Sequence, residues 1–494
     1  MAISRKVREQ MNDSSWIRRM FEEGIELRKI HGAKNVFDLS LGNPLLEPPD
    51  EFRAELARLL ANEAPGTHRY MPNGGFPEVR ASVAEVLAEE SDVPITGNEI
   101  LMTVGAAGAI NTILRSILDQ NDEVVLIAPY FAEYIFYVQH QTGVVKEAQC
   151  DENWLPDIES LEAAIGPRTK AIIINSPNNP TGVIYPESSI AAIATALQQA
   201  EEKYGIEIYL ISDEPYRKLI YSDAPYPFIF DHHKRSVVAT SHSKDLGLAG
   251  ERIGYAAVNP YDPGKNDLMD AMNFSLRTLG FVNAPALMQR AVAGIQRATV
   301  DIDIYRKKRD LLHGALTDIG YECVKPDGAF YLFPKSPIPD ETDFVAQLQK
   351  ELVLVVPGVG FGTPGFFRAS YCVDDWVIEG SIESGVEVLT LFAFSTENWQ
   401  RPRTEIDALM RLLRTYISRE KDDLRKKGVQ VRILGNLANV GSSTMEAIEN
   451  ITKETSRGAN LRLNLMLSYS GRDDLLQACR RFAEEVMVGT VQAK

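Results

Sequence analysis

The sequence has few of the features that mark secreted, metal-binding or membrane-spanning chains. Only four of its 494 residues are cysteines, and they are widely spaced, which excludes a disulfide framework or a zinc ribbon. They are Cys150, Cys323, Cys372 and Cys479. No apolar run approaches the roughly 20 residues that a membrane span needs, and no apolar segment of the kind found in secretion signals follows the first basic residues. We therefore expect a cytoplasmic protein with no membrane span and no metal site.

Positive charge is also scarce. The chain has 52 Lys and Arg against 68 Asp and Glu, a formal net charge of -16 and a pI near 5.1. Nucleic acids and anionic membranes attract clustered basic side chains, so neither is expected as a partner. With 45% hydrophobic and 24% charged residues, the composition is that of an ordinary globular protein. The length predicts about two to four domains.

Short apolar runs alternate with helical stretches through the first half of the chain. The runs are Val124–Ala128, Ala171–Ile174, Ile206–Ile211 and Val237–Thr240. Apolar strands separated by helices are typical of an α/β fold whose mainly parallel sheet is covered on both faces. In such sheets ligands bind at the carboxyl ends of the strands, so the polar loops that follow these runs should converge there.

The loop after the last run combines hydroxyl, amine and guanidinium groups. Ser241, Ser243 and Arg252 could hold a phosphate, and Lys244 could form a Schiff base with a carbonyl compound. A solvated polar turn would be the better explanation of this loop if it stood alone. Convergence with the polar groups of the other loops is difficult to explain by packing, and therefore favours a binding site.

Two further segments carry candidate binding groups. Small residues at 105–109 follow a predicted strand and open a helix, an arrangement that presents unpaired backbone N–H groups to an anion. Later, Arg368 lies on the apolar strand 366–371, within a predicted α+β lobe. A buried guanidinium needs a partner, which would be a carboxylate of the protein or of a ligand.

From about residue 36 to 384 the sequence resembles the fold-type I, class I/II pyridoxal-phosphate-dependent aminotransferases. The resemblance rests on Asn-Asn-Pro-Thr-Gly at 178–182, Asp-Glu-Pro-Tyr at 213–216, Ser-x-Ser-Lys at 241–244 with a following Gly-x-Arg-x-Gly, and the late Arg368. It implies a PLP-dependent transferase fold with a large domain and a small α+β domain. It also implies reversible amino transfer between an amino acid and a 2-oxo acid, with pyridoxal 5'-phosphate as cofactor.

The resemblance assigns catalytic roles to residues around the cofactor ring. Lys244 would form the Schiff base and then move the proton between the substrate Cα and the cofactor. Asp213 would keep the ring nitrogen protonated. Tyr216 and Asn179 would donate hydrogen bonds to the ring oxygen, and Phe131 would stack on the ring face.

Further positions would bind the phosphate and the substrate. Ser241, Ser243 and Arg252 would join the backbone amides of Ala106 and Ala107 around the phosphate. In the substrate-binding set, Arg368 would clamp the α-carboxylate near Gly42 and Asn179. Family members are usually homodimers, and Tyr70 matches the tyrosine that reaches the partner's site.

The identity of the substrate stays open at this point. No second arginine matches a position for a distal carboxylate, so aromatic, aliphatic and other substrates all remain possible. Lyases of the same fold use the same cofactor contacts, and a lyase is the alternative within this class.

Residues from about 386 to 480 resemble part of a cis-prenyl diphosphate synthase similar to undecaprenyl diphosphate synthases. Ser395, Asn398, Trp399 and Arg401 fit one family motif, and Gly471-Arg472-x-Asp474 fits another less well. The opening motif with its Asp and phosphate loop is missing, and so is the late Arg-Thr-Ser-Gly-Glu segment. Asn436 and Ser470 replace an Asp and a Gly. Without groups to hold Mg²⁺ and the leaving diphosphate, this segment is predicted to be inactive.

These observations predict four parts of the chain. An arm at 1–45 contributes to the small domain, a PLP-binding large domain spans 46–290, a small domain spans 291–385, and a truncated prenyltransferase-like segment spans 386–494. The last segment could be a fusion relic or a chimera of assembly, a scaffold for a partner, or a second enzyme that would make the chain an isoprenyl diphosphate synthase. Its incomplete core and open strand edges favour the first interpretation.

Overall fold

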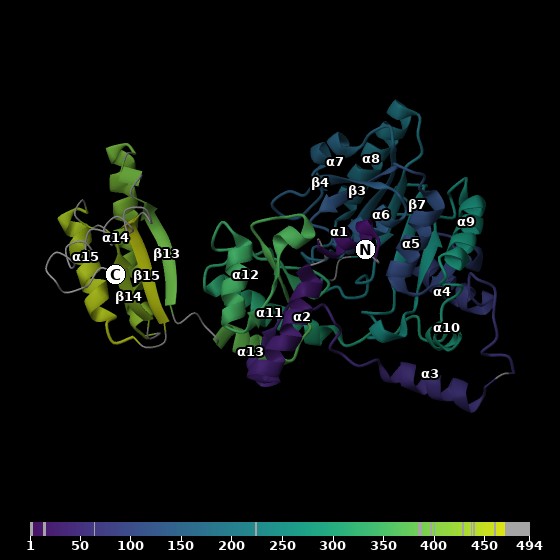
Figure 1. The fold of residues 1–494 in the computed structure, drawn as a ribbon, viewed down its shortest axis with the longest axis horizontal. Coiled ribbons are helices and arrows are strands. Elements are labelled where there is room, and N and C mark those ends of the chain that lie inside the picture. Colours follow the sequence, from purple (N-terminus) through teal and green to yellow (C-terminus); the bar gives the residue numbers. More distant parts are fainter. Residues whose placement is uncertain are drawn as a thin grey trace. The chain divides into compact units, whose positions relative to one another are not determined.

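The computed structural model describes residues 3–12, 16–63, 65–222, 225–383, 388–395, 398–399, 401–426, 429–435, 437, 440–458 and 461–469. The chain forms two compact units, Met1–Glu383 and Ser384–Lys494 (Figure 1). Within the first unit, the boundaries expected near residues 45 and 290 remain predictions.

A seven-stranded sheet forms the centre of the first unit. Its strands, in spatial order, are β2 (Ile100–Thr103), β8 (Gly254–Val258), β7 (Ser236–Ser241), β6 (Tyr209–Asp213), β5 (Thr169–Asn175), β3 (Glu123–Ala128) and β4 (Val144–Gln149). The strands β4, β3, β5, β6 and β7 pair in parallel, whereas β8 is antiparallel to both of its neighbours. The predicted mainly parallel sheet is confirmed, with β8 as its reversed strand.

Both faces of this sheet are buried because most positions of its central strands are apolar. In β3, Val124 and Leu126 pack on one face, while Val125 and Ile127 pack on the other. The first face is covered by α5 (Gly105–Ile117), α6 (Glu133–His140) and α9 (Lys265–Thr278). The second is covered by α3 (Asp50–Ala61), α4 (Pro77–Ser91), α7 (Ile158–Ala164), α8 (Glu187–Tyr204) and α10 (Ala286–Ala293). Full burial of one valine, leucine or isoleucine side chain stabilises the folded state by about 1.5–3 kcal/mol.

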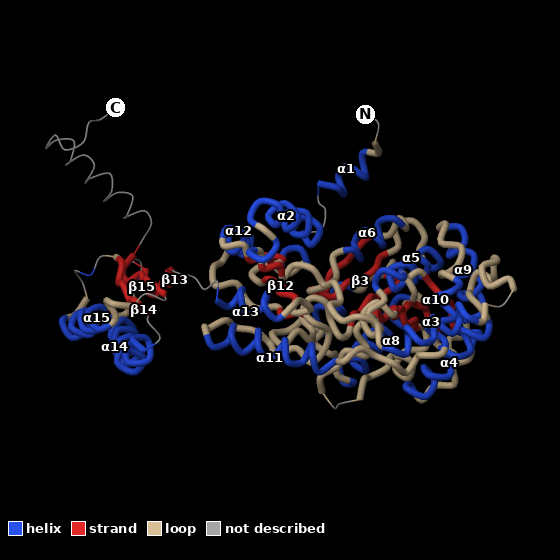
Figure 2. The backbone as a smooth tube through the Cα atoms, turned by 90° about the horizontal axis from the view of Figure 1, so that it is seen from below, coloured by secondary structure: helices blue, strands red, loops and turns tan. Residues whose placement is uncertain are grey.

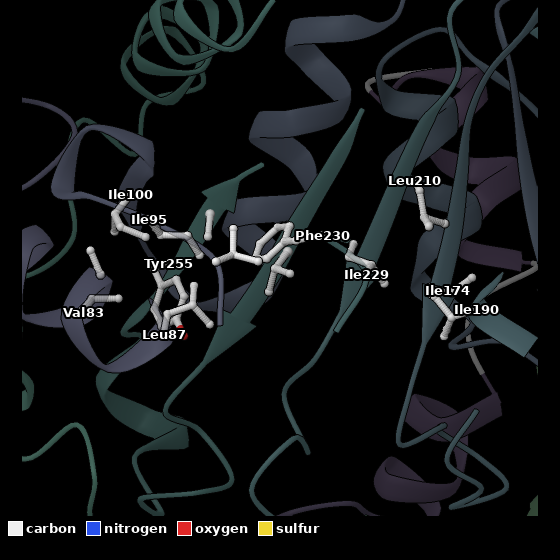
Figure 3. Packing of buried hydrophobic residues seen from close by; sticks show 14 of the residues in the cluster. Val83, Leu87, Ile95, Ile100, Ile174, Ile190, Leu210, Ile229, Phe230 and Tyr255 are labelled. Carbon is white, nitrogen blue, oxygen red and sulfur yellow. The ribbon is translucent and has the colours of Figure 1, made fainter. Parts of the chain in front are cut away.

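The layered arrangement is visible in the figures. Figure 2 shows β3 between α6 on one side and α8 on the other. Figure 3 shows part of the core on the second face, where Val83 and Leu87 of α4 lie near Tyr255 of β8. The two cores pack against opposite faces of the sheet and hold its strands in place. The carboxyl ends of the parallel strands therefore lie together at one edge of the sheet.

One predicted strand begins later than the apolar pattern indicates. Ile208 is fully buried, but its backbone N–H donates to the Glu201 carboxylate at 2.9 Å and its carbonyl oxygen contacts the His233 ring at 2.8 Å. The ladder with β5 starts only at Tyr209. The apolar pattern alone therefore did not separate a strand from a loop at residues 206–208.

The rest of the first unit is an α+β lobe joined by the N-terminal segment. It contains α1 (Arg5–Asn12), α2 (Trp16–His31), β1 (Phe37–Asp38), α11 (Ile302–Asp318), β9 (Tyr331–Leu332), α12 (Glu341–Lys350), β10 (Val353–Leu354), β11 (Val356–Pro357), β12 (Phe367–Ser370) and α13 (Asp375–Glu383). Short 3₁₀ turns are η1 (Ala33–Asn35), η2 (Gly97–Glu99), η3 (Ala249–Glu251) and η4 (Gly358–Phe361). Strands β11, β12 and β9 are antiparallel, and β1 pairs in parallel with β10. The arm is thus built into the small lobe.

The second unit is a small α/β structure. Its parallel strands are β13 (Val388–Ser395), β15 (Leu461–Tyr469) and β14 (Val429–Leu434), in that order. The helices α14 (Arg403–Lys426) and α15 (Ser442–Glu454) lie on one side of this sheet (Figure 2). Their apolar residues, among them Met410 and Ile448, bury the sheet face with Val431. The predicted small α/β part is confirmed.

Several sequence predictions for the second unit fall where the structure gives no description. Ser470, Gly471, Arg472, Asp474 and Asn436 lie outside the described residues, and so does the side chain of Ser395. Trp399 is described, and its indole N–H donates to the Ser468 hydroxyl at 2.8 Å. None of the described helices combines the length and the apolar character that crossing a bilayer requires.

We expect Gly254→Ala to destabilise the first unit. A Cβ on Gly254 would lie 2.3 Å from the Thr240 carbonyl oxygen and 3.0 Å from the Cα of Gly105, so β8 would have to move away from β7. The cost should be roughly 1–3 kcal/mol, measured by thermal unfolding. Gly250→Ala is the control, because nothing lies within 4 Å of the Cβ it would add. Equal melting temperatures for the two variants would contradict this account of the packing.

Candidate active site

A cavity of about 280 Å³ lies where the carboxyl ends of β5, β6 and β7 meet the start of α5 and the small lobe. The predicted site residues that line it are Gly42, Ala106, Ala107, Phe131, Asn179, Asp213, Tyr216, Ser241, Ser243, Lys244, Arg252 and Arg368. Tyr70 is different, because its side chain is 91% exposed and it does not line this cavity. The fold therefore brings together side chains from segments more than 300 residues apart.

The amine of Lys244 points into this cavity. Its Nζ donates to the Gly42 carbonyl oxygen at 2.7 Å and lies 5.3 Å from the centre of the Phe330 ring. Burial lowers the pKa of Lys244 to about 8; Cys372 opposes this shift, and the positive charges of Arg368 and Arg252 add to it. The neutral amine, which is the nucleophilic form, is therefore accessible near physiological pH.

Asp213 offers a carboxylate with one oxygen still available. Oδ2 accepts a short hydrogen bond from the Tyr134 hydroxyl, whereas Oδ1 is buried without a partner among the described residues. Burial raises the pKa of Asp213 to about 7, the Tyr134 hydrogen bond lowers it, and the charge of Glu214 raises it. A cationic N–H group placed at Oδ1 would satisfy this oxygen and stabilise its charged form.

The opposite end of the cavity is built to receive an anion. Helix α5 begins at Gly105, whose φ of 79° places it in the left-handed region. A Cβ there would lie 3.0 Å from Nη2 of Arg252, so glycine allows the guanidinium to approach the helix start. Ala106, Ala107, Ser241 and Ser243 line the same cavity, and they could contribute backbone amides and hydroxyls. This donor set suits a phosphate.

Arg368 is buried without an acidic partner. Only 1% of its surface is exposed. Nη1 donates to Asn179 Oδ1 at 2.9 Å and Nη2 donates to the Ser40 carbonyl oxygen at 2.5 Å, while Nε has no partner among the described residues. No described carboxylate lies within ion-pair distance of it. A guanidinium buried among neutral acceptors is suited to binding a carboxylate brought by a ligand.

Aromatic groups complete the cavity wall. Phe131 packs edge-on against Tyr134, with ring centres 5.5 Å apart, and lines the cavity where a planar ring could stack. The Tyr216 hydroxyl lies 2.8 Å from the Tyr331 hydroxyl. Burial raises the pKa of Tyr216 well above its ordinary value, so this hydroxyl stays protonated and can donate.

Sequence reasoning missed several cavity residues. Tyr134, Tyr137, Asn175 and Tyr331 all line the cavity, and the side-chain amide of Asn175 donates to the Asp213 carbonyl oxygen at 2.8 Å. Tyr134 follows Phe131 by three residues, a spacing that would place both on one face of a helix. Tyr331 gave no comparable signal, because its neighbour Phe330 and the strand pattern both indicate simple core packing.

The fit to pyridoxal 5'-phosphate follows from these groups. A lysine amine, a buried carboxylate oxygen without a partner and an anion-binding helix start face one cavity, which matches the aldehyde, the ring nitrogen and the phosphate of this cofactor. The residues that would hold it are Lys244, Asp213, Ser241, Ser243 and Arg252. Their individual roles remain predictions.

Comparisons with known proteins support the same interpretation. A family model described as aminotransferase class I and II matches residues 34–383. The chain belongs to this family. The probable aspartate/prephenate aminotransferase of Thermus aquaticus is 35% identical over 372 residues, covering 74% of this chain and 94% of that protein. The aspartate aminotransferase of Bacillus subtilis is 32% identical over 369 residues, covering 71% and 90%. The protein is therefore a PLP-dependent aminotransferase.

Solved structures share the fold of the first unit. An aminotransferase from Eubacterium rectale is 37% identical with a TM-score of 0.75, covering 78% of this chain and 97% of that one. The aspartate aminotransferase from Thermus thermophilus with maleate is 30% identical with a TM-score of 0.70, covering 78% and 98%. A second family model, described as putative undecaprenyl diphosphate synthase, matches residues 367–494. The two-part resemblance inferred from the sequence is confirmed.

Bound PLP supplies an electron-withdrawing ring that accepts charge from the substrate Cα. The side chains that line the cavity would provide proton transfer and charge stabilisation. In its predicted role, the Lys244 amine would take and return a proton beside the substrate. Asp213 can hold a positive charge at the ring end of the cavity, because its unpaired Oδ1 is oriented by the Tyr134 bond to Oδ2.

We expect cofactor capture by the cofactor-free aminotransferase to accelerate as pH rises and to level off above about pH 8, because only the neutral Lys244 amine attacks the aldehyde. Absorbance after rapid mixing with PLP measures this rate. Lys244→Ala should form no band that borohydride can reduce.

The control for this experiment is Lys218→Met. Burial also lowers the pKa of Lys218, but this lysine lies outside the cofactor cavity, so the variant should keep the reducible band. A reducible band in Lys244→Ala would show that Lys244 is not the Schiff-base residue.

Proposed function

We propose that this enzyme transfers the amino group of an amino acid with an uncharged side chain to a 2-oxo acid of the same kind, in two half-reactions. The observation that carries this proposal is the set of cations in the cavity. Among the described lining residues, Lys244, Arg252 and Arg368 are the cationic ones, and each is matched to a group that every substrate or the cofactor brings.

The three cations have distinct surroundings that support distinct roles. Arg252 lies at the start of α5, which suits the cofactor phosphate. Lys244 has a lowered pKa, which suits Schiff-base and proton-transfer chemistry. Arg368 has neutral partners only, which suits the substrate α-carboxylate. A second carboxylate on the substrate would find no further cation in this part of the wall.

Relatives named for aspartate make a charged side chain the alternative. The wall of this cavity argues for the uncharged one, because Leu41, Ile110, Phe131, Tyr137 and Tyr331 supply apolar and aromatic surface. Burying an unpaired carboxylate against such surface costs several kcal/mol. Aromatic and aliphatic donors are thus the proposed substrate class.

The proposal includes a homodimer. Tyr70 is strongly exposed and lies outside the cavity of its own chain, as expected of a residue that reaches the cavity of a second copy. A hydroxyl from the partner would add a donor at the phosphate end without adding charge. A contact with a second copy of the chain would account for the exposed position of the Tyr70 side chain.

We expect aromatic and aliphatic amino donors to exceed aspartate in kcat/KM by roughly tenfold or more, with pyruvate exceeding 2-oxoglutarate as acceptor, because the distal carboxylate is left unpaired. A coupled assay of 2-oxo acid formation, with direct identification of both products, measures this preference. A strong preference for aspartate would overturn the proposed substrate class. Elimination products in place of a new amino acid would instead favour the lyase alternative.

A matched variant tests the carboxylate site in the same assay. Arg368→Lys keeps the positive charge but loses the paired donors that hold a carboxylate, so kcat/KM should fall for all donors while the cofactor band stays. Unchanged KM values in this variant would separate Arg368 from substrate binding.

The second unit is proposed to have no prenyl-transfer activity. Its described sheet has three strands, and the sequence lacks the segments that would place Mg²⁺ and hold the leaving diphosphate. Charge that develops as the diphosphate leaves would find no stabilising group. A fusion relic is the proposed origin, ahead of a scaffold for a partner.

We expect the purified full-length chain to give no Mg²⁺-dependent elongation of an allylic diphosphate by isopentenyl diphosphate. Radiolabelled isopentenyl diphosphate, with extraction of the polyprenyl product, measures this activity. Elongation that EDTA abolishes would contradict the prediction and establish a second enzyme in the chain.

A further inference from the structure

Tyr331 lies between Tyr216 and Arg368, to which the proposed function gives different roles. It belongs to β9 in the small lobe and is 2% exposed. Its hydroxyl lies 2.8 Å from the Tyr216 hydroxyl. The guanidinium carbon of Arg368 lies 4.5 Å from the centre of its ring. One side chain therefore contacts both the residue matched to the cofactor oxygen and the residue matched to the substrate carboxylate.

The surroundings of Tyr331 hold it in a single position. Its strand pairs with β12 in the register Tyr331 with Ser370, which places it two residues from Arg368 along the partner strand. Gly42 closes the other side, since a Cβ on this residue would lie 1.9 Å from the Tyr331 hydroxyl oxygen. Glycine at position 42 thus makes room for a hydroxyl that would otherwise be displaced.

The ring of Tyr331 also orients the clamp. The Arg368 guanidinium lies 4.5 Å from the Tyr331 ring centre and 4.9 Å from the Phe361 ring centre. Stacking on aromatic faces restricts the plane of a guanidinium, while Asn179 and Ser40 occupy one donor each of Nη1 and Nη2. These contacts hold the guanidinium in one orientation on the cavity wall.

We infer that Tyr331 is a positioning residue that sets the hydrogen-bond strength of Tyr216 through its hydroxyl and the orientation of Arg368 through its ring. This inference rests on the roles proposed above for Tyr216 and Arg368. It identifies a single side chain of the small lobe as the link between the carboxylate clamp and the cofactor end.

The chemistry of the hydroxyl pair gives the direction of the effect. Burial raises the pKa of Tyr331 to about 12, so both hydroxyls are neutral in the working range. When Tyr216 donates to an anionic ring oxygen, its own oxygen accepts from Tyr331, and chained hydrogen bonds of this kind strengthen one another. This stabilises the anionic oxygen that a deprotonated Schiff base requires, so Tyr331 should lower the pH midpoint of the Schiff base.

Tyr331→Phe tests the hydroxyl alone, because the ring over Arg368 is kept. In the PLP-loaded full-length chain, the pH midpoint of the Schiff-base absorbance band should rise by about half a unit, since one neutral hydrogen bond is lost. KM for the amino donor should stay within about twofold of the wild type. In the double variant Tyr216→Phe/Tyr331→Phe, the midpoint should equal that of Tyr216→Phe alone, because Tyr331 acts through Tyr216.

Tyr331→Leu tests the ring as well. Loss of the aromatic face should raise KM for the amino donor by roughly threefold to tenfold beyond the Phe variant. If the Leu variant does not fold, the Phe variant and the double variant still decide the hydroxyl half of the inference. Binding of a monocarboxylate inhibitor, measured by the change in the band, gives the same comparison without turnover.

Tyr371→Phe is the control. Tyr371 is fully buried and its hydroxyl donates to the Ala329 carbonyl oxygen at 3.3 Å, but it does not line the cavity. The pH midpoint of the Schiff-base absorbance band in Tyr371→Phe should match that of the wild type. A Tyr331→Phe midpoint no higher than this control, with amino transfer intact, overturns the inference and leaves the proposed function standing. A wild-type chain without amino transfer overturns both.

Discussion

Burial lowers the pKa of Lys244, and the two guanidinium groups that share its cavity lower it further. Most other features of the site depend on this crowding of positive charge. A site that keeps three cations together is electrostatically costly without ligands, and an anionic cofactor and a carboxylate substrate would relieve that cost. The preference for such ligands is therefore a property of the folded chain. It arises because the carboxyl ends of parallel strands and the small lobe are held against each other.

Orientation at this site comes in part from groups outside the sequence motifs. Tyr134 fixes one oxygen of Asp213, and Asn179 and Ser40 fix Arg368. His242 lies 3.1 Å from the Asp245 carboxylate, and neither residue lines the cofactor cavity. In contrast to these paired atoms, Oδ1 of Asp213 and Nε of Arg368 have no hydrogen-bond partner among the described residues. Groups left without partners in a core reduce stability and are retained where a ligand satisfies them.

The described part of the second unit follows the same rules of burial. Helices α14 and α15 cover one face of its sheet, and their apolar residues form a core of its own. Its described strands end in two edges, β13 and β14, and strand edges usually require a neighbour or a cover. The family model that matches 367–494 shows what this segment is similar to.

The sequence by itself determined the apolar strands, the lysine loop and the family, because strand burial and motif order are local properties of the chain. It indicated Arg368 as well, since a lone arginine on an apolar strand needs a partner. Only the tertiary structure decided that Tyr331 lies between Tyr216 and Arg368, and that Asp213 keeps one oxygen unpaired. Those facts depend on the register of β9 with β12 and on the packing of α6 against the sheet. Contacts between residues 115 or 37 positions apart, as in Tyr216 with Tyr331 and Arg368 with Tyr331, leave no periodic signal in the chain.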